Sequence, residues 1–355
     1  MHRVMVRPAS YENCREAVAH AFDLFPVQVK GKKVLVKPNA LRASDPEQGI
    51  VTHPAVLRAV VEKLEELDPA EIIVGDNPGM MSYGANEETF QKTGLMEAAK
   101  GHYCNISSEA LEIDFVPKFR DRISISRAVL EAEVVISVPK FKTHGLTVIT
   151  GAIKNSYGFI PGALKAGLHR ITGNAMRFSE MMVEVFRLKV PDFIIIDAVV
   201  GMEGNGPAST DLRTIGRIMA SDNAVALDAT MARMMGLDPQ SLPFLQIAKQ
   251  RGLGDFDADS IKILGDLKAL PNFKLPPSVQ KAEEMPTGAG EFFLSRIRLR
   301  PEADKDLCTG CGTCIEQCPV SALSLEDGLP EVDTEICIAC FCCQEMCPEM
   351  AIRLC

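Results

Sequence analysis

The sequence predicts an α/β domain, built on a largely parallel sheet flanked by helices, followed by a small α+β domain rich in cysteine. Two observations support this division. Short apolar runs rich in Val and Ile alternate with longer segments of helical periodicity, which is typical of βαβ units. Ten of the 12 cysteines then fall after residue 300. We therefore expect an α/β domain over 1–270, a linker or extended connection over 271–300, and a second domain over 301–355.

The first predicted elements form a strand, a helix and a second strand. Lys33–Lys37 and Glu71–Val74 are short apolar runs bounded by turn residues, and His53–Leu67 between them has helical spacing. Thr52 is the expected N-cap of this helix, because Pro54 suits a first helical turn.

The same alternation continues along the chain. Val134–Val138, Phe193–Ile196 and Ile215–Ala220 are further apolar strands, and Asn223–Met235 is a helix. Polar motifs follow several of the strands. Because ligands of open α/β sheets bind beyond the carboxyl ends of the strands, we expect one composite cleft there. The later segment Pro271–Gly290 has four prolines and little periodicity, which favours a linker.

The first polar motif covers residues 138–162 and contains lysines, a histidine and a Gly/Pro loop. Lys140 and Lys142 would point the same way in an extended backbone and could clasp one anion. His144 can carry a proton or bind a metal. Lys154 can act as an electrophile, a base or a covalent anchor.

The second polar motif, residues 197–207, places acids and an amide on a glycine-rich turn. With the first motif it completes the candidate site. The predicted catalytic residues are His144, Lys154 and Glu203, and the predicted substrate-binding residues are Asp76, Lys140, Lys142, Asn155, His169 and Asn205.

Charge is unevenly distributed along the chain, whose net charge is −9. Residues 301–355 hold 11 acidic and two basic residues, whereas residues 134–179 contain no Asp or Glu. A basic segment concentrates anions, so we expect a small carboxylate or phosphate ligand. A solvated basic face is the alternative. Nucleic acid is not expected as a partner, because aromatic residues are few in this segment and no binding motif occurs.

Two cysteine runs in the last domain share the spacing C-x2-C-x2-C-x3-C-P. The first begins at Cys308 and the second at Cys337, so the motif repeats after 29 residues. Structural zinc uses two C-x2-C pairs separated by a longer spacer, and disulfides need an oxidising compartment. Neither describes these runs. Thiolates at this spacing are ligands of [4Fe–4S] clusters.

Both runs resemble the bacterial-type ferredoxins that hold two [4Fe–4S] clusters. The resemblance implies a dicluster ferredoxin-like domain in which the fourth cysteine of each run binds the other cluster. The implied ligands are Cys308, Cys311, Cys314 and Cys347 for the first cluster, and Cys318, Cys337, Cys340 and Cys343 for the second. Cys342 leaves a possible slip by one residue in the second run, and Cys355 has no assigned role.

Several segments of the first domain, among them VKPN, VGDNPG, VPKFKTHGLTVITGAIKN and DAVVGMEGNGP, resemble the family of proteins with domain of unknown function 362. Its members are often joined to a ferredoxin module. The family resemblance implies no reaction beyond iron–sulfur redox work, and a further cofactor stays unknown.

Residues 144–169 also resemble the cofactor region of nickel-pincer lactate racemases. By that resemblance Lys154 would anchor the pincer, His169 would bind nickel and His144 would be the acid or base.

Three functions are consistent with these patterns. The protein can be an oxidoreductase that relays electrons from its clusters to an anionic substrate or cofactor in the basic cleft. It can be a non-catalytic electron carrier or maturation factor that docks a redox partner. Alternatively, its clusters are structural and the cleft does non-redox chemistry. We expect a cytoplasmic protein from an oxygen-poor setting, because no secretory signal or membrane-spanning run is visible.

Overall fold

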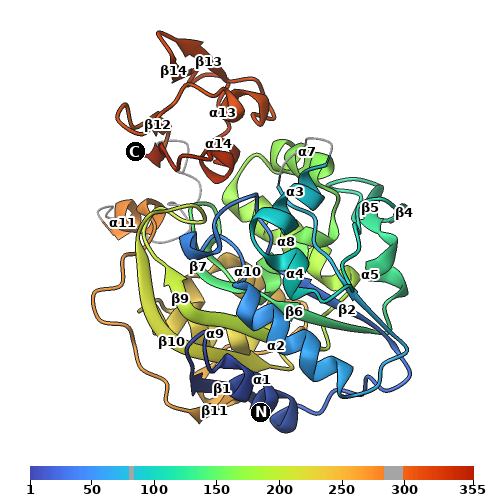
Figure 1. Ribbon diagram of the computed structural model, residues 1–355. Helices are drawn as coiled ribbons and strands as arrows, with labels where there is room; N and C mark the ends of the chain where they lie inside the picture. The colour runs from blue at the N-terminus through green and yellow to red at the C-terminus, as the bar shows by residue number, and fades with distance from the viewer. Residues whose placement is uncertain (80–83, 284–298) are drawn as a thin grey trace.

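The computed structural model describes residues 1–79, 84–283 and 299–355. Its larger part is an α/β domain, and the cysteine-rich C-terminal module, residues 301–355, stands over one end of that domain (Figure 1). The strands of the large sheet are β1 (His2–Pro8), β2 (Lys33–Pro38), β3 (Glu71–Val74), β6 (Val134–Val138), β7 (Lys140–His144), β8 (Val148–Thr150), β9 (Phe193–Met202), β10 (Leu212–Ser221) and β11 (Ile261–Gly265).

The large sheet is mixed and mostly parallel, with the order β11-β1-β10-β9-β6-β2-β3. Strand β2 lies parallel to β3 and β6, and β6 lies parallel to β9. Only β10 runs against its neighbours on this path, β1 and β9. The predicted α/β class is therefore confirmed. Strands β9 and β10 extend beyond their predicted ends, and β7 pairs with β9 beyond the end of β6.

Helices cover both faces of the sheet. Along β9, Ile194 and Ile196 join one core with α8 and α9, whereas Ile195 joins the other with α1 and α2. The helices are α1 (Cys14–Leu24), α2 (Pro54–Glu65), α3 (Ala85–Lys92), α4 (Leu95–Ala98), α5 (Arg127–Glu131), α6 (Ala152–Asn155), α7 (Gly162–Thr172), α8 (Ala175–Leu188), α9 (Ala224–Met234), α10 (Pro243–Gln250) and α11 (Pro277–Glu283). Among the described residues, none of these helices combines the length and apolarity needed to cross a bilayer.

The predicted N-cap of α2 is wrong by one residue. His53 occupies that position, and its Nδ1 accepts a hydrogen bond from the Ala55 N–H at 3.2 Å. The hydroxyl of Thr52 instead joins two strands, because it donates to the Val138 carbonyl and accepts from the Asn39 N–H. A tertiary contact thus displaces the local capping preference.

The C-terminal module is a small α+β unit that repeats one pattern. Its elements are β12 (Pro301–Ala303), α13 (Thr313–Glu316), β13 (Leu323–Glu326), β14 (Leu329–Val332), α14 (Cys342–Met346) and β15 (Ile352–Leu354). Strand β12 pairs with β15, and β13 with β14. Helices α13 and α14 each follow the first two cysteines of one run, as expected for a duplicated motif.

The predicted linker is only partly described. Its beginning is attached to the α/β domain, because the Phe273 ring packs edge-on against Phe141 and the Lys274 N–H donates to Glu203. Helix α11 follows. Residues 284–298 of the predicted linker lie outside the described residues. The segment before α11 is therefore an extended, packed connection.

Candidate functional site

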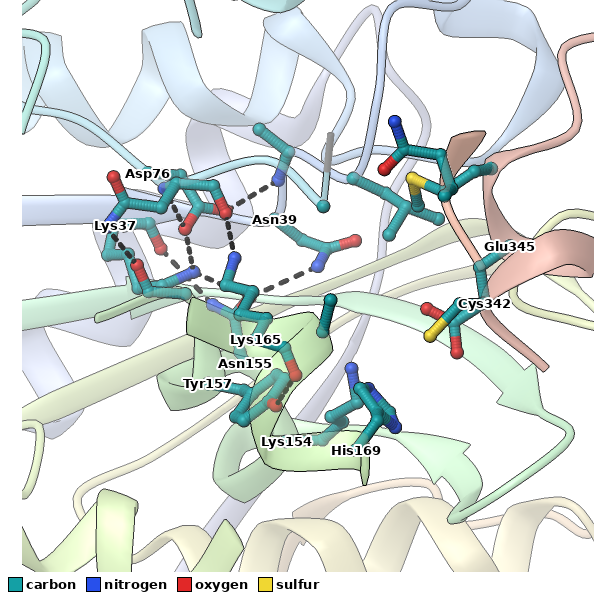
Figure 2. A pocket seen from close by; sticks show the side chains of 18 residues that line it. Lys37, Asn39, Asp76, Lys154, Asn155, Tyr157, Lys165, His169, Cys342 and Glu345 are labelled. Carbon is teal, nitrogen blue, oxygen red and sulfur yellow. Dashed lines mark hydrogen bonds and ion pairs between the residues drawn. The ribbon is translucent and has the colours of Figure 1, made fainter. Parts of the chain in front are cut away.

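A partly open cavity lies between the α/β domain and the C-terminal module (Figure 2). Residues at the carboxyl ends of β2 and β3 line one side, α6 and α7 another, and α14 covers it. This is the edge of the sheet at which the composite cleft is expected.

Lys37 and Asp76 form a buried ion pair at the ends of β2 and β3. Lys37 is 1% exposed, and its Nζ lies 2.7 Å from Asp76 Oδ1. The same amine donates to Asn155 Oδ1 at 3.0 Å, while Asp76 Oδ2 accepts from the Ala40 N–H. A Cβ at Gly158 would lie 2.0 Å from Asp76 Oδ1, so glycine is required there. Asp76 therefore serves first to neutralise Lys37.

Lys154 and Asn155 are positioned by the short helix α6. Asp228, on α9, accepts hydrogen bonds from the Ala152 and Ile153 N–H groups at 2.6 and 3.0 Å and so caps that helix. Burial raises the pKa of Asp228 to about 7, although these two donors oppose the shift. Lys154 is half-buried, and its Nζ lies 5.3 Å from the centre of the Tyr157 ring. It has no hydrogen bond or ion pair with any described residue, so its charge is available to a ligand.

Helix α7 contributes Lys165 and His169. The Lys165 amine donates to the main-chain carbonyls of Asn77 and Pro78, at the end of β3. Burial lowers the pKa of Lys165 to about 7, against the opposing charge of Asp76. The His169 ring stacks on Phe178 with 4.4 Å between ring centres. Figure 2 shows Lys154 and His169 on the side of the cavity that faces Glu345 and Cys342.

The C-terminal module contributes Glu345 to the cavity. One oxygen of Glu345 lies 3.1 Å from His144 Nε2. The other ring nitrogen, Nδ1, accepts from the Leu146 N–H, so the proton of a neutral His144 lies on Nε2, facing Glu345. Burial raises the pKa of Glu345, but His144, Lys154 and His169 outweigh it and hold this pKa at about 2.

The structure divides the predicted site residues. Asp76, Lys154, Asn155 and His169 line the cavity, and His144 reaches it through Glu345. The other predicted residues do not line it. The catalytic or binding roles of these four residues are untested predictions, and their surroundings favour structural roles. They are Lys140, Lys142, Glu203 and Asn205.

Lys140 and Lys142 do not converge on one anion. Lys140 Nζ lies 2.8 Å from Asp197 Oδ2 and donates to the Tyr11 hydroxyl, deep in the domain. Lys142 Nζ donates to the Ile50 carbonyl at 2.5 Å. Both lysines are buried, so they do not belong to a solvated basic face, whereas Arg170 and Arg177 of the same segment are exposed.

Glu203 and Asn205 hold other parts of the chain. Glu203 Oε2 lies 3.1 Å from Arg213 Nη1 and fastens the segment after β11. The Asn205 side-chain amide donates to the Ile352 carbonyl, and the Asn205 main-chain carbonyl accepts from the Gln344 side chain at 2.6 Å. Asn205 thus ties the C-terminal module to the α/β domain.

Three cysteines of the first run lie beside one cysteine of the second run. Cys308, Cys311 and Cys314 line a second cavity together with Cys347, which comes from the other run. This is the set that the ferredoxin resemblance implies for the first cluster. Main-chain N–H groups of Ala322 and Ala351 donate to the sulfurs of Cys318 and Cys347, both at 3.3 Å. Such donors stabilise cluster thiolates.

Cys343 and Cys342 differ in their surroundings. Besides burial, the negative charges of Cys340, Cys337, Cys318 and Cys314 raise the pKa of the Cys343 thiol. Cys342 lines the cavity between the two domains, and a hydrogen bond with Cys340 raises its pKa. The choice of Cys343 as the ligand stays a prediction from the spacing.

Residues 34–233 match the family described as domain of unknown function (DUF362), which covers more than half of the chain. The chain belongs to the DUF362 family. Residues 300–348 match a 4Fe-4S dicluster domain, so this DUF362 protein carries a ferredoxin-like 4Fe-4S domain.

Among curated proteins, the thylakoid-associated protein sll1697 of Synechocystis is 31% identical over 260 residues, which is 69% of this chain and 77% of that protein. A probable ferredoxin of Methanosarcina thermophila is 64% identical over 22 residues, covering 6% of this chain and 38% of that protein.

Two solved structures are distantly similar to this DUF362 protein. The lactate racemase apoprotein of Thermoanaerobacterium thermosaccharolyticum has a TM-score of 0.44 and 14% identity, over 66% of this chain and 56% of that one. A Thermotoga maritima protein has a TM-score of 0.40 and 14% identity, over 68% and 60%.

Sequence reasoning missed several residues of the cavity. Lys165 was visible only as one more base in a segment without acids, and Lys37 only as part of a strand. Asp228, which does not line the cavity but caps α6, lies inside a helix with no motif around it. Glu345 had no distinguishing signal, because its importance depends on where the C-terminal module docks.

Proposed function

We propose that this protein is an iron–sulfur oxidoreductase that passes electrons from two [4Fe–4S] clusters to a small anionic substrate or cofactor in the cavity. One observation carries the proposal. Gln317 and Cys342, each adjacent to an implied ligand of the second cluster, line the same cavity as Lys154 and His169. When bound, the clusters supply electrons one at a time.

The cavity residues support binding of an anion. The charge of Lys37 is neutralised by Asp76, whereas Lys154 makes no ion pair with any described residue and acts on Glu345 without a direct contact. Its ammonium group can therefore bind a carboxylate or phosphate. Reduction of an organic acceptor by two electrons also consumes two protons. Lys165, with a pKa of about 7, can release one of them near neutral pH, and solvent at the open side can supply the other.

The module's other side supports exchange with a redox partner. Cys311 is exposed, and the module is strongly acidic, so a basic partner protein is expected to dock there. A cytoplasmic location belongs to the same proposal, because cysteine thiols stay reduced in that compartment.

The test uses protein purified without oxygen and reduced with dithionite. Rapid mixing with fumarate or 2-oxoglutarate should identify an acceptor by the return of cluster absorbance. The variant Lys154→Ala should slow this reoxidation by roughly 100-fold or more while iron content stays unchanged, because an oriented charge at the acceptor is lost. Lys268→Ala, at a lysine whose side chain is 75% exposed, is the matched control.

Equal reoxidation rates for wild type and Lys154→Ala would contradict the proposal. That result would favour the alternative, a non-catalytic electron carrier or maturation factor in which the α/β domain only docks a redox partner.

A further inference from the structure

Arg42, in the loop after β2, is a buried cation with no counter-charge in contact among the described residues. It is 4% exposed, and among those residues only its Nη1 has a partner, the Ala43 carbonyl at 3.2 Å. Its Nε and Nη2 are buried and make no hydrogen bond, and within the described ranges Arg42 forms no ion pair. An isolated buried charge costs several kcal/mol, so such a group requires an explanation.

Loss of a proton cannot remove this cost. A buried lysine such as Lys142 can become neutral, and burial indeed lowers its pKa well below the usual value. Guanidinium remains protonated in proteins, because its intrinsic pKa lies above about 12. Arg42 therefore keeps its charge and needs a nearby anion.

The position of Arg42 points to the C-terminal module. The preceding residue, Leu41, accepts a hydrogen bond from the Gly79 N–H at 2.8 Å. A Cβ at Gly79 would lie only 2.6 Å from Cε of Met346. The loop of Gly79, which is hydrogen-bonded to Leu41, therefore packs directly against the residue before Cys347. Burial lowers the pKa of Arg42, and the anions that oppose this shift are Cys347 and Glu349.

Neither residue alone balances the guanidinium. Glu349 is exposed and makes no ion pair with Arg42. Cys347 is buried and is an implied ligand of the first cluster, together with Cys308, Cys311 and Cys314. A [4Fe–4S] core with four thiolates is a net anion and gains one further negative charge when it is reduced.

We propose that Arg42 is the electrostatic partner of the first cluster and raises its reduction potential relative to that of the second. A fixed positive charge stabilises the reduced cluster more than the oxidised one, since the reduced form is more negative. The α/β domain thereby adjusts a cluster that it does not ligate. This inference does not depend on which molecule the cavity binds.

The experiment is an EPR-monitored redox titration of the full-length protein, purified without oxygen. Arg42→Met removes the charge and keeps most of the volume, and Arg42→Lys keeps the charge. At a fixed potential, Arg42→Met should lower the ratio of reduced to oxidised first cluster by a factor on the order of ten. For a one-electron couple, this corresponds to a reduction potential that is lower by about 59 mV. The second cluster should change less, and Arg42→Lys should remain near wild type. Arg120→Met, at an exposed arginine, is the control.

Each outcome decides the proposal. If Arg42→Met loads both clusters and lowers the potential of the first cluster more than that of the second, the proposal holds, and a larger shift of the second cluster would overturn it. If both potentials remain at wild-type values, it is overturned. Should Arg42→Met fail to load clusters, a normally loaded Arg42→Lys with unchanged potentials would still support a requirement for charge. Failure of both variants to load would overturn it, because the role of Arg42 would then be steric.

Discussion

The two cysteine runs have the same spacing but different surroundings. In the first run, Cys311 and the neighbouring Thr309 are exposed. In the second run, Ala339 and Phe341 are 1% and 2% exposed and join the hydrophobic core that also contains Phe141 of the α/β domain. One copy of the motif therefore faces solvent, and the other is embedded in the domain interface.

This difference gives the two clusters different tasks under the proposed function. Electrons would be received at the exposed run and delivered at the buried run, which adjoins the cavity through Cys342. The backbone dihedral angles also reflect the duplication. Gly310 and Gly312 have positive φ, and so do Ala339 and Phe341, which stand 29 residues later. Packing of Phe341 in the interface compensates for a conformation that normally favours glycine.

Removal of one ligand from each run tests this division most directly. Cys340→Ala should leave the exposed cluster, and Cys311→Ala the buried one. A reduced basic electron-transfer protein should then reduce the remaining cluster roughly tenfold faster in Cys340→Ala, because it docks on the acidic module and the tunnelling distance grows with burial. Stopped-flow absorbance measures both rates, and dithionite serves as a small donor that should reduce either variant. Equal rates with the protein donor would remove the distinction between the runs.

Substitution of the adjacent cysteines sharpens the ligand assignment in the buried run. Cys343→Ala should lose iron and the EPR signal of one intact [4Fe–4S] cluster, since a thiolate ligand disappears. Cys342→Ala should keep the wild-type iron content, because Cys342 faces the cavity. Iron analysis of the two variants side by side decides the assignment, and the reverse pattern would show that the ligand position slips by one residue.

Gln344 provides a measure of how firmly the buried run is docked. Its side chain donates to the Asn205 and Ala208 carbonyls, while Ile315 holds the equivalent position in the exposed run. Gln344→Ala should cost about 1–3 kcal/mol, because buried carbonyls lose their donor. This loss of stability should appear as faster hydrogen exchange of the α14 amides. Gln317→Ala, at a glutamine that makes neither of these two hydrogen bonds, is the control. Unchanged exchange would mean that apolar packing alone docks the module.

The smallest expected effect concerns the glycines of the exposed run. Gly310 has φ of 67°, and an added Cβ would lie 2.9 Å from the Gly328 carbonyl oxygen. Gly310→Ala should therefore lower the free energy of unfolding by about 1–2 kcal/mol. Gly312→Ala should cost less, because no atom lies within 4 Å of its added Cβ. Thermal loss of cluster absorbance compares the two, and equal midpoints would contradict the steric part of the argument.

Much of the fold was predictable because its signals are local. Strands β3 and β6 have the predicted bounds, and α9 differs from its prediction by one residue at each end, with Asn223 as its N-cap. The site was less predictable. Lys140 and Lys142 have favourable types and spacing for an anion site, yet Lys140 pairs with Asp197, 57 residues away in the chain.

By itself, the sequence determined the α/β class and the two cysteine runs, because strand periodicity and ligand spacing depend on residues that are near one another in the chain. The tertiary structure decided which charges are neutralised and which remain available. Lys37 donates a hydrogen bond to Asn155, which is 118 residues away in the chain, and Lys154 has no ion-pair partner among the described residues. It also decided which cysteine run is buried, since that depends on the docking of two domains. Such contacts join distant segments, and no local pattern specifies them.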